Sequence, residues 1–349
     1  MKKIRLFTGF VAISLLLVAC GEEATQHASS STENNALQVE QNTSQSTALS
    51  GDTSESLIKT NTDDPTEDPS LDIVLNEVQS KFKQLSYTDE ETGVTLAYNL
   101  YVPEDYDEDT KYPMVSFIHD DSVVGSGVAG ALTQGYGGAI WATEAEQAKH
   151  ASFVLVPYFE TSTVEGGMGQ SGSSVVEAQV QTYYDLLQEL QKEYSIDTNR
   201  LYQTGQSMGG MTSFYLNATY SDLFAATLYV SSQWDVNQLN ALENQKFFYI
   251  VAGGDNQAMT GQTDLMNLLE NDGISYSTAE WDAVWSAEQK NTAANEMIGE
   301  NTDQNFVHWA TGSVLTDGEN MEHMASFDYG YTVPAVRNWL FNQSKADER

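Results

Sequence analysis

Short apolar runs alternate with segments of helical periodicity along most of the chain after residue 71. The apolar runs predict strands at residues 94–103, 112–120, 151–159, 200–204, 224–231, 246–253 and 275–281. The first of these alternates apolar and polar residues, as a half-exposed strand does, whereas the next two are almost continuously apolar. Continuous apolar strands are typical of a parallel sheet that is covered on both faces.

Helices are predicted between these strands. The clearest is at 176–194, where apolar residues recur every three or four positions and define one buried face: Val176, Val180, Tyr183, Leu187, Leu190 and Tyr194. Further helices are predicted at 139–150, 211–220, 257–273 and 331–343. This alternation predicts an α/β fold, with a doubly wound, mostly parallel sheet and helices on both faces. Residues 71–349 are long enough to form one such domain.

The first seventy residues have a different composition. Residues 1–19 combine a basic start with a short apolar run, which predicts a secretory signal peptide. Leu-Val-Ala-Cys at residues 17–20 resembles the bacterial lipobox, so we expect Cys20 to be lipidated and to anchor the protein at the outer face of the cell membrane. The alternative is an ordinary signal peptide with a chance cysteine. Residues 20–70 are rich in Ser, Thr, Asn, Gln and acidic residues, which predicts a disordered tether.

Charge and cysteine content exclude several functions. The chain has 15 Lys and Arg residues against 50 Asp and Glu residues, a formal net charge of −35, so nucleic acid is an implausible partner. Cys20 is the only cysteine, which excludes an internal disulfide and a cysteine-based metal site. The sequence contains no metal-binding, phosphate-binding or dinucleotide-binding motif, so we expect no metal and no cofactor. The acidic pairs at 63–64 and 120–121 are expected to be solvated rather than to bind calcium.

One short motif points to chemistry. Gly205-Gln206-Ser207-Met208-Gly209 lies between the strand predicted at 200–204 and the helix predicted at 211–220. Gly-x-Ser-x-Gly at such a junction is typical of a nucleophile elbow, a tight turn that exposes the serine and needs small residues on either side. A second Gly-Gln-Ser at 169–171 follows no apolar strand and lacks a second glycine at the right spacing, which predicts a surface loop. Ser207 is therefore the candidate nucleophile.

A serine nucleophile needs a base and an acid that orients the base. For this type of elbow the expected chain order is serine, acid, histidine. His323 lies in a polar segment just before the last predicted helix and is the candidate base, and Asp255, which follows the strand at 246–253, is the candidate acid. The competing acids are Asp235, Asp264 and Asp282.

An oxyanion hole completes such a site. The backbone N–H of Met208 is one predicted donor, and a second is expected near Asp120 or Asp121, in the loop after the strand at 112–120. Carboxylates at these positions would repel a developing oxyanion unless they point away from it. His119, at the end of the same strand, is expected to be structural. Four further residues are candidates for contact with substrate: Gln206, Trp141, Tyr158 and Trp234.

Three segments carry a resemblance to known enzymes: residues 100–120, 195–216 and 323–343. They resemble α/β-hydrolase esterases related to polyhydroxybutyrate depolymerases and feruloyl esterases, and also the catalytic domains of prolyl oligopeptidase-like serine peptidases. The resemblance implies an α/β-hydrolase fold in which Ser207, Asp255 and His323 are nucleophile, acid and base. It also implies substrates that are acyl esters of sugars, phenolic acids or polyesters.

The leading hypothesis is therefore a surface-anchored serine hydrolase that cleaves carboxylic esters, either small or carried by a polymer, through an acyl-enzyme. Residues 282–305 are a candidate lid over its site. A peptidase acting on short peptides is the alternative within catalysis, although few basic residues are available to bind a peptide C-terminus. A non-catalytic ligand-binding lipoprotein on the same fold is the alternative outside it. The pattern does not indicate an oligomeric state.

Overall fold

The computed structural model describes residues 68–316 and 318–348. The predicted signal peptide, the lipidation site Cys20, residues 63–64 and all but the end of the predicted tether lie outside these residues. Within the described part of the chain, no helix combines the length and the apolar character needed to cross a bilayer.

A nine-stranded sheet runs through the described domain. In spatial order its strands are β1 (Lys83–Thr88), β2 (Thr95–Tyr101), β4 (Phe153–Tyr158), β3 (Tyr112–Ile118), β7 (Ile196–Gln206), β8 (Ala226–Val230), β9 (Phe247–Ala252), β11 (Gln304–Trp309) and β10 (Ser277–Trp281). From β4 to β10 all neighbouring strands pair in parallel. The β1–β2 and β2–β4 pairs are antiparallel. The predicted mostly parallel sheet is confirmed.

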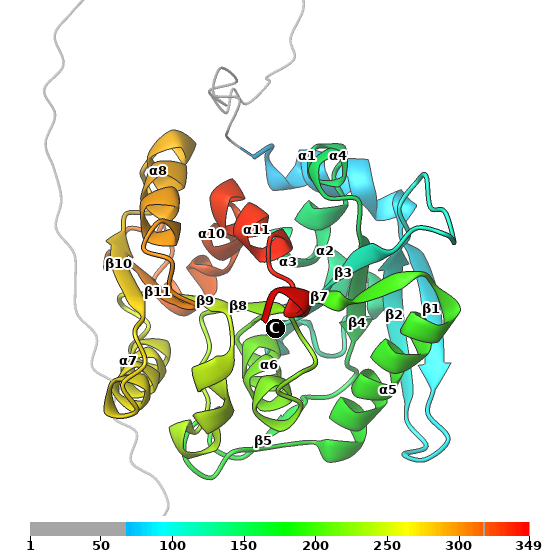
Figure 1. Cartoon of the computed structure of the whole chain (residues 1–349), viewed down its shortest axis with the longest axis horizontal. Helices are drawn as coiled ribbons and strands as arrows, with labels where there is room; N and C mark the ends of the chain where they lie inside the picture. The colour runs from blue at the N-terminus through cyan, green and yellow to red at the C-terminus, as the bar shows by residue number, and fades with distance from the viewer. Residues whose placement is uncertain (1–67, 317, 349) are drawn as a thin grey trace, which may run out of the picture. The chain divides into compact units, whose positions relative to one another are not determined.

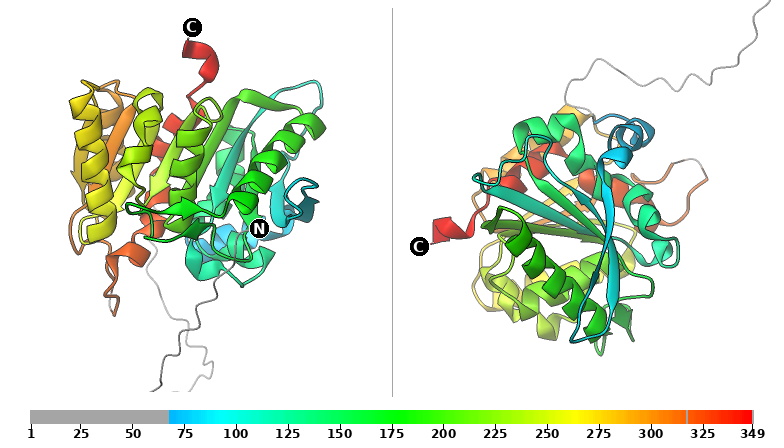
Figure 2. Two further views of the ribbon diagram at one scale, coloured as in Figure 1. Left: turned by 90° about the horizontal axis from the view of Figure 1, so that it is seen from below. Right: turned by 90° about the vertical axis from the view of Figure 1, so that its right-hand side faces the viewer.

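Helices cover both faces of this sheet (Figures 1 and 2). One face packs against α1 (Leu71–Val78), α2 (Val128–Thr133), α3 (Tyr136–Ala139), α8 (Ala287–Ile298), α10 (Phe327–Tyr331) and α11 (Pro334–Phe341). The other face packs against α5 (Glu177–Glu193), α6 (Met208–Thr219) and α7 (Asn256–Asn271). Each helix layer forms its own apolar cluster with the strand residues that face it.

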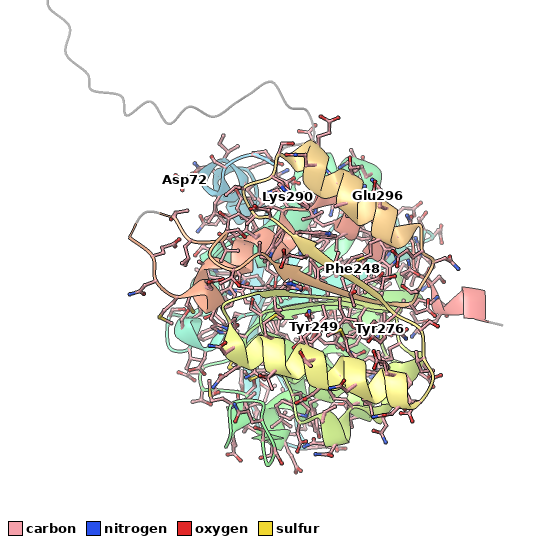
Figure 3. All side chains as sticks on the ribbon, turned by 90° about the vertical axis from the view of Figure 1, so that its left-hand side faces the viewer. Asp72, Phe248, Tyr249, Tyr276, Lys290 and Glu296 are labelled. Carbon is pink, nitrogen blue, oxygen red and sulfur yellow. The ribbon has the colours of Figure 1, made fainter. Side chains whose placement is uncertain are left out.

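Strand β9 shows why the apolar runs are continuous. Its neighbouring residues Phe248 and Tyr249 lie on opposite faces of the sheet, Phe248 on the side of α8 and Tyr249 on the side of α7 (Figure 3). Phe248 packs edge-on against Trp339 at 4.8 Å between ring centroids, and Tyr249 packs against Phe214 at 5.2 Å. Because both faces are buried, every position along the strand favours an apolar side chain.

The helix predicted at 176–194 is α5, and Val180, Tyr183 and Leu187 on its predicted face are buried. The helix predicted at 139–150 is interrupted instead. Its residues belong to the end of α3, a 3₁₀ turn at Ile140–Ala142, and α4 (Glu144–Lys149). The break falls at Thr143, which adopts an extended backbone and caps α4 by accepting a hydrogen bond from the Glu146 N–H at 3.4 Å.

The candidate lid at 282–305 is wrong. Half of this segment is α8, the crossover helix that joins β10 to β11. Its buried face holds the small or flexible residues Ala287, Ala294 and Met297, and Asn291 accepts a hydrogen bond from the Ala335 N–H at the start of α11 at 2.8 Å. The segment is thus a layer of the fold rather than a cover over the site.

Candidate active site

Ser207 lies at the tight turn between β7, which ends at Gln206, and α6, which begins at Met208. Its backbone is in a strained region, with φ 49° and ψ −118°. Two backbone hydrogen bonds hold it there. The Ser207 N–H donates to the Val230 carbonyl oxygen at 3.1 Å, and the Ser207 carbonyl oxygen accepts from the Met211 N–H at 2.9 Å. The nucleophile elbow expected from the motif is therefore present as a geometric feature.

The glycines of the motif let three backbone segments approach one another closely. A Cβ atom on Gly209 would lie 2.0 Å from the carbonyl oxygen of Ile118, at the end of β3. A Cβ atom on Gly205 would lie 2.5 Å from the carbonyl carbon of Gly209. Both neighbours are backbone atoms, which have little room to move aside. The small residues are therefore required by the packing of the elbow against β3.

The three candidate catalytic side chains meet at the carboxyl ends of the parallel strands. Asp255 follows β9, and His323 lies in the short helix α9 (Glu322–Ala325), beyond β11. His323 Nδ1 lies 2.5 Å from Asp255 Oδ2, and His323 Nε2 lies 2.9 Å from Ser207 Oγ. A proton on Nδ1 that is donated to the aspartate leaves Nε2 free to accept the serine proton. The structure thus brings together residues separated by up to 116 positions.

Asp255 is oriented as the N-cap of α7. Its Oδ1 accepts a hydrogen bond from the Ala258 N–H at 3.2 Å, which leaves Oδ2 for the imidazole. The competing acids have other contacts. Asp235 caps a 3₁₀ turn by accepting from the Asn237 N–H at 3.1 Å, and Asp282 accepts from the Val284 N–H at 3.0 Å. Asp264 lies inside α7.

His323 is also held from behind. The ring of Phe327 meets the imidazole edge-on at 5.1 Å, and Ser326 Oγ donates to the His323 carbonyl oxygen at 3.0 Å. The hydroxyl groups of Ser326 and Ser231 lie 2.5 Å apart, and both residues are fully buried. Ser231 follows β8 and comes directly after Val230, whose carbonyl oxygen accepts the hydrogen bond from the Ser207 N–H. Sequence reasoning missed this pair, because no local pattern marks two serines that are 95 residues apart.

The predicted oxyanion donors lie next to the elbow. Met208 is the first residue of α6, so its N–H has no acceptor within the helix and lies at the positive end of the helix dipole. The Asp120 carboxylate is engaged elsewhere: Oδ1 accepts from the Ser122 N–H at 2.8 Å, and Oδ2 accepts from Gln206 Nε2 at 2.7 Å. Asp121 is exposed. The second donor, from the backbone of this loop, stays a prediction.

Gln206 does not have the substrate-binding position that the sequence suggested. It is 3% exposed, and its amide nitrogen donates to Asp120 and to Gln134 Oε1 at 3.2 Å. The side chain therefore ties the elbow to the loop after β3.

His119 has the environment of a structural residue. Its Nε2 accepts a hydrogen bond from the Phe159 N–H at 3.0 Å, so the ring proton is on Nδ1, which donates to the Asp120 carbonyl oxygen at 2.8 Å. Burial lowers the pKa of His119, which favours this neutral form. The ring thereby joins the ends of β3 and β4.

The aromatic candidates for substrate contact are mostly inaccessible. Trp141 is fully buried and donates to the Gly137 carbonyl oxygen at 2.7 Å, so it belongs to the core. Trp234 is 3% exposed and donates to Gln238 Oε1 at 3.1 Å. Because both side chains are buried, the predictions that Trp141 and Trp234 contact substrate are wrong. Tyr158 is half-buried at the end of β4, where it stacks on His119 at 5.9 Å, and its contact with substrate stays a prediction.

The second Gly-Gln-Ser lies in the loop between the two-residue strands β5 (Val164–Glu165) and β6 (Ser174–Val175). Ser171 in this loop is exposed and follows no strand of the main sheet. It therefore lacks the setting of an elbow. Among the described residues, no group of three or more His, Cys, Asp or Glu side chains is arranged to hold a metal ion.

A serine at a strand-to-helix elbow, with its acid and histidine on loops after later strands of a mostly parallel sheet, defines the α/β-hydrolase class. Within this class the chain belongs to an esterase family, since the family model described as "Putative esterase" matches residues 90–325. The matched region contains Ser207, Asp255 and His323. Among curated proteins, no sequence matches the chain significantly.

Solved structures share the fold at low sequence identity. The crystal structure of a thermostable esterase superposes with a TM-score of 0.63 at 22% identity, covering 77% of this chain and 64% of that one. A serine-to-alanine mutant of the feruloyl esterase module from Clostridium thermocellum, complexed with sinapinate, gives a TM-score of 0.51 at 14% identity. That comparison covers 79% of this chain and 93% of the module. The chain thus spans slightly less than two thirds of the thermostable esterase.

Proposed function

We propose that this protein is a serine hydrolase that cleaves carboxylic esters through an acyl-enzyme. The observation that carries the proposal is the continuous hydrogen-bonded series from Asp255 Oδ2 through His323 to Ser207 Oγ, with spacings of 2.5 and 2.9 Å. Nucleophile and base within hydrogen-bond reach, with the base oriented by a third group, are the requirements for an activated serine. Membership of an esterase family supports an ester as the substrate.

In the first half-reaction, Ser207 Oγ attacks the ester carbonyl carbon while His323 Nε2 takes the hydroxyl proton. Asp255 holds the imidazole in the required tautomer and stabilises the imidazolium that forms. The carbonyl oxygen becomes an oxyanion beside the start of α6, where the Met208 N–H donates to it. When the intermediate collapses, the bond to the alkoxy group breaks and the imidazolium protonates the leaving alcohol.

In the second half-reaction, water replaces the alcohol. His323 takes a proton from water, the hydroxide attacks the acyl carbon, and the bond to Ser207 breaks as the proton returns to the serine. His323 is 29% exposed on its side chain, which gives water a route to Nε2. No cofactor is needed for either step.

We propose an uncharged or weakly charged ester as substrate, with a phenolic or sugar ester carried by a polymer as the leading class. The feruloyl esterase module that shares the fold was solved with sinapinate, a phenolic acid. A net charge of −35 disfavours anionic peptides and polyanions. We further propose that the lipobox-like sequence ending at Cys20 anchors the enzyme outside the cell, with residues 20–70 as a tether.

The test is turnover of p-nitrophenyl esters, from acetate to octanoate, together with fluorophosphonate labelling of the full chain. Ser207→Ala should abolish both turnover and labelling. Ser171→Ala, in the second Gly-Gln-Ser, is the matched control and should preserve both. A dipeptide p-nitroanilide tests the peptidase alternative, and we expect it to be cleaved far more slowly than the esters. A folded protein that neither labels nor turns over any ester would overturn the proposal and favour the ligand-binding alternative.

A further inference from the structure

Glu322, the residue directly before His323, connects the two loops that carry the acid and the base. Its Oε2 accepts a hydrogen bond from the Gly254 N–H at 3.0 Å, and its Oε1 accepts from the Gly312 N–H at 3.0 Å. Gly254 directly precedes Asp255 at the end of β9, and Gly312 follows β11. One carboxylate therefore joins the loop after β9, which carries Asp255, to the start of the connection after β11, which leads to His323.

Gly254 leaves the space that the Glu322 carboxylate occupies. A Cβ atom at this position would lie 2.0 Å from Glu322 Oε1 and 2.4 Å from Cδ. The backbone of Gly254 is not in the left-handed region, so the reason for a glycine here is the close approach of the carboxylate. Any larger residue would have to displace the end of the Glu322 side chain.

The loop that carries His323 has few other attachments on this side. Helix α9 is four residues long, which is too short to be stable by itself. Met321 and Met324, which flank Glu322 and His323, are 58% and 41% exposed and supply no buried anchor. The Ser326–Ser231 contact holds the far end of the loop. Glu322 is half-buried and supplies the link at the near end, beside the imidazole.

We propose that Glu322 is a positioning residue, which holds the loops of Asp255 and His323 together so that the imidazole fits between the aspartate and the serine. It does not touch the reacting atoms. Hydrogen bonds from N–H groups to a carboxylate are shorter and stronger than those between neutral groups, which suits a residue that holds two loops together. The inference rests on the proposed function, because it assigns a role within the same catalytic site.

Three variants test whether the two hydrogen bonds of Glu322, and not its charge alone, hold the loops in place. Glu322→Ala removes both hydrogen bonds. Glu322→Gln keeps one acceptor oxygen but presents an NH₂ group to the second backbone N–H, so it should retain part of the effect. Gly254→Ala keeps the glutamate and forces its carboxylate away from the loop of Asp255. The matched control is Glu319→Ala, since Glu319 lies in the same segment and its carboxylate accepts hydrogen bonds from the Thr316 N–H and Oγ1, both at 2.8 Å.

The measurement is the rate and the endpoint of fluorophosphonate labelling of Ser207, with kcat and KM for a p-nitrophenyl ester alongside. A displaced base should lower the labelling rate and kcat by about 10- to 100-fold, because small misplacements of a catalytic group have effects of this size. KM should change by less than about twofold, since no substrate contact is lost. The rates should rank wild type, Glu322→Gln, then Glu322→Ala, with Gly254→Ala close to the last.

The endpoint distinguishes positioning from loss of folded protein. A positioning role leaves the labelled fraction near that of wild type while the rate falls. The inference is overturned if Glu322→Ala and Gly254→Ala label at the wild-type rate, or if the labelled fraction falls in proportion to the rate. It is also overturned if Glu319→Ala is as slow as Glu322→Ala. A wild-type protein that does not label at all contradicts the proposed function instead, so the two failures are distinguishable.

Discussion

Arg337 links the two ends of the described domain, and its replacement leads to a specific prediction about stability. The side chain is 1% exposed, and its guanidinium donates to both carboxylate oxygens of Asp68, at 2.7 and 2.8 Å. It also donates to Glu146 Oε1 at 3.0 Å and to the Tyr331 carbonyl oxygen at 2.5 Å. Burial disfavours the charged guanidinium, but Glu146 and Asp68 outweigh this effect and raise the pKa of Arg337. Arg337→Met removes the charge and keeps much of the apolar stem.

The expected loss follows from what remains buried. Removing one partner of a buried ion pair costs about 3–5 kcal/mol, because the other charge is left uncompensated. Asp68 can turn towards water, as its side chain is already 12% exposed, but the Glu146 side chain is only 3% exposed. Lys149 still contacts Glu146 at 3.1 Å, although it is 46% exposed and compensates weakly. We therefore expect a loss of about 3 kcal/mol, or about 6–12 °C in Tm for a domain of this size.

Urea unfolding and thermal unfolding, each followed by circular dichroism, measure this loss. Lys149→Met is the control for an exposed ion pair and should cost less than about 1 kcal/mol. Adding Glu146→Gln to Arg337→Met removes the uncompensated charge and should restore part of the stability. A free energy of unfolding for Arg337→Met within about 1 kcal/mol of wild type would refute the reasoning.

The same ion pair predicts a pH dependence. Burial by itself would raise the pKa of Glu146, but Arg337 and Lys149 lower it below its ordinary value of 4.5. A carboxylate with a lowered pKa in the folded state stabilises the protein above its unfolded pKa, and this contribution is lost as the pH falls through the folded pKa. The difference in unfolding free energy between wild type and Arg337→Met should therefore shrink below about pH 4.5. A difference that stays constant to pH 3 contradicts this assignment.

Three further predictions follow from the domain boundary and the site. A chain that begins at residue 71, the boundary predicted from the sequence, lacks Asp68 and should be less stable than one beginning at residue 66, by about 1.5–3 kcal/mol in urea unfolding. Asp255→Asn should lower kcat by about three to four orders of magnitude with the fold intact, because the amide disfavours the required tautomer of His323; a loss below tenfold would argue against Asp255 as the acid. Gly209→Ala should cost about 1–3 kcal/mol in thermal unfolding and slow the labelling of Ser207, because its Cβ would meet a backbone oxygen of β3; unchanged labelling would show that the elbow tolerates the shift.

The sequence was most informative where a local pattern has a single structural solution. Continuous apolar runs predicted the parallel strands, because burial on both faces favours apolar side chains at most positions. Gly-x-Ser-x-Gly could be distinguished from the second Gly-Gln-Ser by its neighbours, since only Ser207 has a strand before it and a helix after it. The chain order of serine, acid and histidine then pointed to Asp255 and His323, which the structure places in contact.

The errors arose where tertiary packing decides the outcome. Trp141 lies in the helix predicted at 139–150 and was a candidate for substrate contact, but its indole N–H is satisfied by the Gly137 carbonyl oxygen inside the core, so no part of it needs solvent or substrate. Residues 282–305 contain the crossover helix α8 and not the predicted lid, and the sequence signal for this helix is weak because its buried face holds only Ala287, Ala294 and Met297. The hydrogen bond between Glu322 and Gly254 joins residues 68 positions apart, and no periodicity records such a contact.

The order of the strands has a consequence for how activity appears during synthesis. β11 pairs between β9 and β10, although it follows both in the chain, and His323 comes only after β11. A growing or prematurely ended chain that stops before residue 304 therefore contains the serine and the acid, but has a gap in its sheet and no base. Hydrolysis by this triad therefore requires the chain through His323, with β11 in place between β9 and β10. A label on Ser207 would thus also report that the C-terminal part of the sheet is present.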